Sequence, residues 1–295
     1  MTTALCLGTA QFGMEYGLRP VGRPPKKPSR DEVFRMLDLA REGGIEWLDT
    51  SAAYGDAEIL LGDYPQGSAF HIATKQMPNR FEQSGGTGLE LLSTMRIEYQ
   101  CSVARLNQAP RVYLFHSSRY IFRPELTDAF LKFQNSTLRV GVSCYEPEEA
   151  HVAIRLGMRA IQIPSNVLDQ RFAKAGILET AQARDVQVFA RQPFLQGLLL
   201  LHPNELPDRV QQAHDVVRAF QIICAEQGLT SVHGALGFAL TQPGVDYVVF
   251  GVENGEQLQE DLAAASHVRE GFDRIPFQTL ADNISESIVN PSRWK

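Results

Sequence analysis

The sequence predicts an α/β fold, a single-domain (β/α)8 TIM barrel that spans residues 1–295. Short β-rich runs alternate with stretches of helical periodicity almost from end to end, which is typical of repeated βα units around a parallel sheet. Most of these runs are too apolar to face water on either side, as in a sheet that helices cover. There are eight such runs, the number that closes a barrel.

The expected strands are separated by helical stretches and turn residues. They are Leu5–Thr9, Ile45–Thr50, Phe70–Lys75, Arg111–His116, Leu138–Ser143, Ala160–Pro164, Val186–Ala190 and Tyr247–Gly251. In a parallel barrel the C-terminal ends of all strands meet at one mouth, so we expect functional residues there.

Amphipathic stretches between the strands predict the surrounding helices. Arg30–Glu42 and Leu89–Arg105 carry apolar residues at helical spacing, so one face of each should pack on the outside of the sheet. Glycines follow several helical runs, at positions where a left-handed residue would end a helix; they are Gly43, Gly44, Gly157 and Gly228.

Two segments do not fit simple βα units. Arg19–Pro28 is basic and rich in proline, and Gln196–Pro207 lies between the seventh strand and the next helix. Both would lie on the face where the strands end. On a barrel that face carries the active site, so these loops are candidates for binding a ligand.

Composition narrows the function classes. The 28 basic and 34 acidic residues give a net charge of −6, so no electrostatic footprint for a nucleic-acid partner is expected. The N-terminus lacks the features of a signal peptide and no stretch approaches the ~18 apolar residues of a membrane span, so we expect a soluble, cytoplasmic protein. The cysteines form no CxxC and the histidines no HExxH pair, so we expect no metal.

Several common catalytic motifs are missing. No GxGxxG follows the first strand, which disfavours a Rossmann domain. Neither a GxxxxGK[ST] phosphate loop nor a GxSxG nucleophile elbow is present, so phosphate transfer and serine hydrolysis lose their usual markers.

Four ionisable residues lie at or just beyond the ends of consecutive expected strands. Asp49, Lys75 and His116 belong to the second, third and fourth strands, and Tyr54 follows in the loop after Asp49. An ordinary phenol, with a pKa near ~10, is a weak acid at neutral pH, but an adjacent ammonium such as Lys75 would lower that pKa. Asp49 would keep Lys75 charged, and His116 would donate to a substrate oxygen or relay a proton. The cluster therefore suits carbonyl reduction with Tyr54 as the proton donor.

One segment resembles the signature that the aldo/keto reductases carry around their aspartate and proton-donating tyrosine: DTSAAYGDAE at 49–58, followed by Leu61-Gly62. By that resemblance Asp49, Tyr54, Lys75 and His116 match the family's catalytic tetrad. The likeness extends over nearly the whole chain, through LGTAQFG, GVSCYEPEEA, FLQGLLL and GVENGEQLQEDLAAA.

The resemblance also implies a nicotinamide cofactor, NADP(H) or NAD(H), extended across the barrel mouth. Ser143 and Gln162 would hold its carboxamide, and the segment from Gly251 to Asp261 would meet its phosphates and adenine beside a helix N-terminus, which suits an anion. The implied cofactor-binding residues are Thr9, Ser143, Gln162, Arg191, Gly251, Val252, Asn254, Gln257, Glu260 and Asp261.

Three departures from the better-known members affect this cofactor site. Cys144 replaces the usual asparagine, Arg191 takes the place of an aromatic under the nicotinamide, and Gly251 and Gln257 replace basic residues that bind the 2′-phosphate of NADPH. Glu253 adds a nearby negative charge. We therefore expect less than about tenfold discrimination between NADPH and NADH, and a guanidinium of Arg191 lying flat against the nicotinamide or a nearby phosphate.

The resulting hypothesis is an NAD(P)(H)-dependent oxidoreductase that interconverts an aldehyde or ketone and its alcohol by direct hydride transfer. Two alternatives remain open: a cofactor-binding redox sensor or docking barrel with little turnover, and a lyase or epimerase that acts on a sugar. Basic and polar loops favour a hydroxylated or acidic small molecule. The candidate residues are Phe12 and Arg119 for substrate contact, with Arg19, Arg23, Lys26 and Lys27 as the basic group of the first loop.

Overall fold

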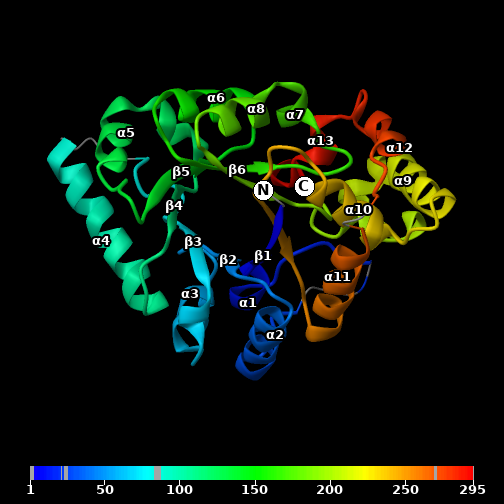
Figure 1. The fold of residues 1–295 in the computed structure, drawn as a ribbon, viewed down its shortest axis with the longest axis horizontal. Helices are drawn as coiled ribbons and strands as arrows, with labels where there is room; N and C mark the ends of the chain where they lie inside the picture. The colour runs from blue at the N-terminus through cyan, green and yellow to red at the C-terminus, as the bar shows by residue number, and fades with distance from the viewer. Residues whose placement is uncertain (1–2, 21, 23–25, 83–87, 269–270, 295) are drawn as a thin grey trace.

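The computed structural model describes residues 3–20, 22, 26–82, 88–268 and 271–294, which form a closed barrel of parallel strands. The strands pair in chain order, and β8 closes the ring by pairing with β1 (Figure 1). They are β1 (Ala4–Gly8), β2 (Trp47–Asp49), β3 (His71–Lys75), β4 (Val112–Phe115), β5 (Arg139–Ser143), β6 (Ala160–Pro164), β7 (Gln187–Arg191) and β8 (Tyr247–Gly251). All eight expected strands are present, so the predicted fold class is confirmed.

Several strands end earlier than the sequence suggests. The run 45–50 was expected to be a strand throughout, but β2 covers only Trp47–Asp49. Thr50 still donates its N–H to Ala73 O at 2.8 Å, so the chain follows the neighbouring strand briefly before it turns into the loop. His116 likewise lies one residue beyond β4. Both therefore belong to the mouth of the barrel.

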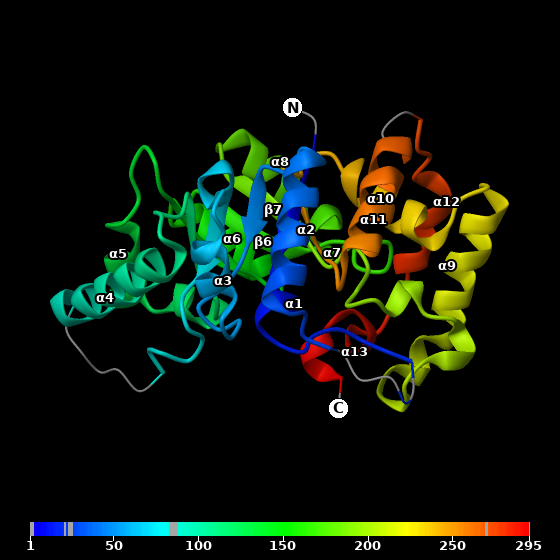
Figure 2. The same cartoon turned by 90° about the horizontal axis from the view of Figure 1, so that it is seen from below.

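Helices cover the outside of the strands (Figure 1). They are α1 (Ala10–Gly13), α2 (Arg30–Glu42), α3 (Ala57–Asp63), α4 (Gly88–Leu106), α5 (Pro124–Leu131), α6 (Pro147–Arg155), α7 (Arg171–Lys174), α8 (Ile177–Ala183), α9 (His214–Glu226), α10 (Ser231–Leu240), α11 (Gly255–Val268), α12 (Ile275–Gln278) and α13 (Glu286–Val289). Figure 2 shows the loop after α1 and the C-terminal α13 at the same end of the barrel. Within the described part of the chain, none of the helices is long and apolar enough to cross a membrane.

Helix α2 shows how local sequence sets these elements. Ser29 and Glu32 form a capping box, in which Ser29 Oγ accepts from Glu32 N and Ser29 N donates to Glu32 Oε2 at 2.7 Å. The helix ends at Gly43, and Gly44 takes the left-handed conformation with φ of +78°. Gly157 and Gly228, with φ of +87° and +68°, end α6 and α9 in the same way, as expected.

The barrel interior is filled in layers, and the layers place the site. One buried cluster plugs the inside of the ring: Cys6, Trp47, Ala73, Val112, Leu114, Ala160, Phe189 and Val249. Because side chains alternate along a strand, the residue two positions further on also faces inward. Those residues form the next layer toward the mouth: Gly8, Asp49, Lys75, His116, Gln162, Arg191 and Gly251. Most of the candidate site residues named from the sequence therefore lie at one end of the barrel.

Candidate active site

A buried ion pair forms the centre of this mouth layer. Lys75 Nζ lies 2.8 and 2.7 Å from the two carboxylate oxygens of Asp49, and 2.9 Å from Thr50 O. Both charged side chains are almost completely buried. A buried charge needs a partner of opposite sign, and here the ammonium and the carboxylate satisfy one another.

The hydroxyl of Tyr54 lies next to this pair. Lys75 Nζ donates to Tyr54 Oη at 3.4 Å and lies 5.0 Å from the centre of the ring. Two glycines fix the loop that carries the tyrosine: Gly55 has a φ of +56°, and a Cβ on Gly13 would lie 1.7 Å from Tyr54 O. Only glycine at both positions lets α1 pack directly on this turn.

His116 completes the group. Its Nδ1 lies 3.0 Å from Ser51 Oγ, and its ring meets the Tyr54 ring edge-on with centroids 5.9 Å apart. The structure therefore brings together all four residues that the sequence nominated as catalytic, Asp49, Tyr54, Lys75 and His116. Ser51, which orients the imidazole, was not singled out, although it lies within the quoted signature.

The electrostatics differ from the expectation in one respect. The sequence suggested that Lys75 would lower the pKa of Tyr54, but burial, followed by the charge of Asp49, raises the pKa of that phenol above its ordinary value. The expected lowering is not found because burial has the largest effect and the charge of Asp49, which binds the ammonium with both oxygens, adds to it, so Lys75 does not bring the pKa of this phenol below its ordinary value. For His116, burial and the positive charges of Lys75 and Arg191 lower the pKa to about 3. At neutral pH Tyr54 is therefore a protonated phenol and His116 a neutral imidazole.

A cavity of about 780 Å³ opens above the tetrad and runs toward the start of α11. Tyr54, His116 and Asp49 line it, whereas Lys75 lies beneath them. It is also lined by nine of the ten residues proposed for cofactor binding: Thr9, Ser143, Gln162, Arg191, Gly251, Val252, Gln257, Glu260 and Asp261. The tenth, Asn254, instead caps α11, because its Oδ1 accepts from Gln257 N at 2.9 Å.

Polar side chains connect the tetrad to the cavity wall. Gln162 Nε2 donates to Asp49 Oδ1 at 2.7 Å, and Gln162 Oε1 lies 3.4 Å from Ser143 Oγ. The two residues expected to hold a carboxamide are thus adjacent, and the orientation of the Gln162 amide is set by Asp49.

Arg191 forms another part of the wall. Its guanidinium lies over the ring of Tyr145, 4.6 Å from the centroid, and one nitrogen donates to Cys144 O at 3.1 Å. Its Nε is buried without a hydrogen-bond partner. The guanidinium does stack on an aromatic ring, but contact with a nicotinamide stays a prediction.

The far end of the cavity is acidic. Glu253 forms an ion pair with Arg19, a cation of the first loop that also lines the cavity. Burial and the charge of Glu260 raise the pKa of Asp261 to about 8. Gln257, in place of a basic residue, accepts from Glu253 N at 2.9 Å.

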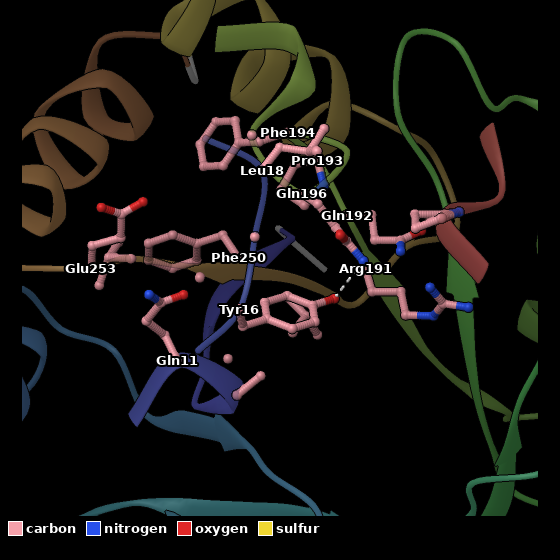
Figure 3. Close-up of a pocket in the computed structure, with 18 of the residues that line it drawn as sticks. Gln11, Tyr16, Leu18, Arg191, Gln192, Pro193, Phe194, Gln196, Phe250 and Glu253 are labelled. Atoms are coloured by element: carbon pink, nitrogen blue, oxygen red, sulfur yellow. Dashed lines mark hydrogen bonds between the residues drawn. The ribbon is translucent and has the colours of Figure 1, made fainter. Parts of the chain in front are cut away.

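The loops after β1 and β7 meet over the cavity, a contact that the sequence did not reveal. Leu18 N donates to Gln196 O at 2.8 Å, and Gln196 Nε2 donates to Tyr16 Oη at 3.1 Å (Figure 3). Gln192 and Gln196 have φ of +66° and +55°, which is unusual for residues other than glycine. Gln196 is the first residue of the segment Gln196–Pro207, and Tyr16 and Leu18 lie just before the segment Arg19–Pro28. These are the two segments that do not fit simple βα units.

The candidate substrate contacts are not brought to the cavity. Phe12 is fully buried in α1, and Arg119 is 65% exposed in its side chain, where it pairs with Glu82 at 2.9 Å. Among the basic residues of the first loop, Lys27 pairs with Asp56. Arg23 lies outside the described residues.

Comparisons with known proteins agree with this geometry. Among curated proteins, the chain is similar to the aldo-keto reductase str7 of Strobilurus tenacellus, with 24% identity over 81% of this chain and 77% of that protein. It is also similar to the L-glyceraldehyde 3-phosphate reductase of Escherichia coli, with 22% identity over 90% of this chain and 77% of that protein.

A solved structure shares the fold, that of a protein from Pseudomonas aeruginosa assigned to the aldo-keto reductases. The TM-score is 0.65 at 22% identity, and the match covers 90% of this chain and 91% of the other. The model of the aldo/keto reductase family matches residues 4–273, nearly the whole barrel. The chain therefore belongs to the aldo/keto reductase family, the enzymes that reduce carbonyl groups with NAD(P)H.

Proposed function

We propose that this protein reduces the carbonyl group of a small aldehyde or ketone and that Tyr54 supplies the proton. The observation that carries the proposal is the Tyr54 hydroxyl, which lines the cavity, is held protonated by burial and lies 3.4 Å from the ammonium of Lys75. A carbonyl oxygen placed in the cavity within reach of this hydroxyl would accept a proton from it.

The cavity fits a nicotinamide dinucleotide. Its volume of about 780 Å³ lies within the range of ligand pockets, and it extends from the tetrad to the acidic end beside α11. Ser143 and Gln162 offer hydrogen-bonding groups for a carboxamide. Helix α11 begins at Gly255, between the lining residues Glu253 and Gln257, so its N-terminus would suit a phosphate of the cofactor. When bound, NADPH or NADH supplies the hydride.

Each member of the tetrad has a separate task in this proposal. Lys75 stabilises the phenolate that remains after Tyr54 has given up its proton, and Asp49 keeps Lys75 in place. His116 is neutral, lines the cavity and has its Nδ1 3.0 Å from Ser51 Oγ. In the tautomer that carries the proton on Nε2, Ser51 would donate to Nδ1 and Nε2–H would be the donor to the carbonyl oxygen. Both donors act on the same oxygen.

The substrate class proposed from the sequence, a polar carbonyl compound such as a sugar, is in keeping with the name of the Escherichia coli relative, a reductase of L-glyceraldehyde 3-phosphate. A cytoplasmic location and the lack of a nucleic-acid or membrane partner remain predictions from composition.

The test is the rate of NADPH and NADH oxidation with a panel of aldehydes, for the wild type and for Tyr54→Phe. We expect turnover by the wild type and a loss of about 10²-fold or more in kcat for Tyr54→Phe, with cofactor affinity nearly unchanged. Tyr16→Phe is the matched control, because it removes a second phenol of the same cavity; its kcat should fall less than about tenfold.

Near-normal kcat in Tyr54→Phe would refute the assignment of Tyr54 as the proton donor. Tight cofactor binding without turnover of any aldehyde would favour a redox sensor, and conversion of a sugar without net redox change would favour an epimerase.

A further inference from the structure

The tetrad end of the cavity holds a positive charge without a counter-ion. The ammonium of Lys75 and the carboxylate of Asp49 neutralise one another through contacts of 2.8 and 2.7 Å, and His116 and Tyr54 are uncharged at neutral pH. Arg191 lines the same cavity and makes no ion pair with any acidic side chain in the part of the chain that the structure describes. Its charge is therefore added to a group that is otherwise neutral.

The groups in contact with Arg191 are neutral. One guanidinium nitrogen donates to Cys144 O at 3.1 Å, and the guanidinium carbon lies 4.6 Å from the ring centre of Tyr145. Glu149 of α6 accepts from Tyr145 N at 2.7 Å, but its other oxygen accepts from Ser118 Oγ, so this carboxylate is engaged away from the arginine. The field of an uncompensated charge acts on whatever molecule lies beside it, and most strongly where water is excluded.

The position of Arg191 places this charge beside the nicotinamide of the proposed cofactor site. Cys144, which accepts from Arg191, directly follows Ser143, and Ser143 Oγ lies 3.4 Å from Gln162 Oε1; this is the pair proposed to hold the carboxamide. Burial raises the pKa of Tyr54, and the charge of Arg191 opposes that rise, so its field also reaches the proton donor. A ring whose carboxamide is held by the pair and whose hydride reaches a carbonyl at Tyr54 would lie between them, next to Arg191.

The nicotinamide ring changes its charge in the proposed reaction. When a hydride passes to the carbonyl carbon and Tyr54 gives its proton to the carbonyl oxygen, a neutral dihydronicotinamide becomes a positively charged nicotinamide. A guanidinium is attracted to the face of a neutral, electron-rich ring, whereas it repels a ring that carries a positive charge. The same side chain, Arg191, therefore acts in opposite directions on the two oxidation states of the cofactor.

From these observations we infer that Arg191 makes the protein select the reduced nicotinamide cofactor, NADPH or NADH, over the oxidised form and promotes release of the oxidised form after reduction. This inference rests on the proposed reductase function and adds to it a role in cofactor exchange. The aromatic residue that the sequence resemblance implies at this place in better-known family members has no charge and cannot supply this selection. Since the effect is one of binding, the overall equilibrium of the reaction is unchanged.

The experiment measures the affinity of both oxidation states in the absence of a carbonyl substrate. Calorimetric titration with NADPH and NADP⁺, and with NADH and NAD⁺, at one pH and one ionic strength gives the ratio of Kd, oxidised over reduced. Contacts with the adenosine and the phosphates are common to both forms and cancel in this ratio. The variants are Arg191→Gln, Arg191→Lys and, as the matched control, Arg19→Gln. Arg19 also lines the cavity but pairs with Glu253, which Figure 3 shows on the opposite side of Tyr16 from Arg191.

In Arg191→Gln we expect the ratio to fall by about tenfold or more from its wild-type value, the size expected for the loss of a unit charge close to the ring. Arg191→Lys should keep most of the ratio because it retains the charge, and Arg19→Gln should keep all of it. ADP-ribose, which lacks the nicotinamide, should bind the wild type and Arg191→Gln within about threefold of one another. An unchanged ratio in Arg191→Gln would overturn the inference. A ratio in Arg191→Lys as low as in Arg191→Gln would also overturn it, because charge would not be the cause.

The same titrations separate this inference from the proposed reaction. If Arg191→Gln weakens NADPH, NADP⁺ and ADP-ribose to the same extent, Arg191 holds a phosphate and the inference is wrong, while the reductase proposal stands. If the ratio depends on Arg191 but no aldehyde of the panel is reduced, the reductase proposal fails and the selection by Arg191 stands. If the wild type binds neither oxidation state, both fail.

Discussion

Replacing Lys75 by methionine should destabilise the protein and impair catalysis for two separable reasons. The substitution keeps the length of the side chain but removes an ammonium that lies within 2.9 Å of both Asp49 oxygens and of Thr50 O. Asp49 would then be a buried carboxylate with Gln162 Nε2 as its remaining donor among the interactions observed. Breaking a buried ion pair on one side costs about 3–5 kcal/mol in the free energy of unfolding.

The double variant Asp49→Asn/Lys75→Met separates the two effects. It removes both charges, and the amide oxygen introduced at position 49 can still accept from Gln162 Nε2, so we expect its stability to lie within about 2 kcal/mol of the wild type. Its kcat should be about 10²-fold or more below that of the wild type, as in Lys75→Met, because the phenolate of Tyr54 would lack a neighbouring cation. Stability is measured by urea unfolding and kcat at saturating cofactor. Equal destabilisation in the single and double variants would refute the account of the ion pair. Full kcat in either variant would show that proton transfer from Tyr54 does not depend on Lys75.

Two further predictions concern the acidic end of the cavity. The folded cofactor-free protein holds a proton on Asp261 up to a pKa of about 8, far above that of the unfolded chain, so its free energy of unfolding should fall between pH 5 and pH 7.5. Asp261→Asn should remove on the order of 2 kcal/mol of this fall, and a parallel pH dependence in both proteins, measured by urea unfolding, would contradict it. We expect the ion pair between Arg19 and Glu253 to keep the discrimination between NADPH and NADH below about tenfold. Glu253→Gln should free Arg19 for a 2′-phosphate and raise the preference for NADPH by about tenfold or more. The ratio of the two dissociation constants, from fluorescence titration, tests this; an unchanged ratio would place the 2′-phosphate away from Arg19.

The features that were predictable from sequence are those that depend on position along a strand. Apolar strand-like runs alternate regularly with helical stretches, and this pattern predicted the barrel. Side chains along a strand point alternately to the two faces of the sheet, which placed Asp49, Lys75 and His116 in one layer. Tyr54 follows because it lies in the short loop directly after Asp49, where Gly55 takes a positive φ of +56°. In each case a few neighbouring residues determine the position.

The features that were missed depend on contacts between loops that are far apart in the chain. The bond from Leu18 to Gln196 spans most of the barrel sequence, and no local pattern announces it. Arg119 was a candidate for substrate contact because the loop after His116 is polar and cationic, but its side chain is exposed and paired with Glu82. The other candidate, Phe12, is buried in the core. The direction of the Tyr54 pKa shift was misjudged for a similar reason, because it depends first on burial, which only the assembled fold provides, and then on the charge of Asp49.

The position of Asp49 explains why the proton-donating and cofactor-binding parts of the site belong to one network. Its carboxylate accepts from Lys75 on one side, which in turn donates to Tyr54, and from Gln162 Nε2 on the other. Because an amide has its donor and its acceptor at opposite corners, fixing Nε2 on Asp49 directs Gln162 Oε1 toward Ser143 and the cavity. That oxygen is suited to accept from a carboxamide N–H. A substitution at Asp49 should therefore alter both the proton donor and the orientation of the amide that faces the cofactor site, whereas substitution of Tyr54 alters only the first.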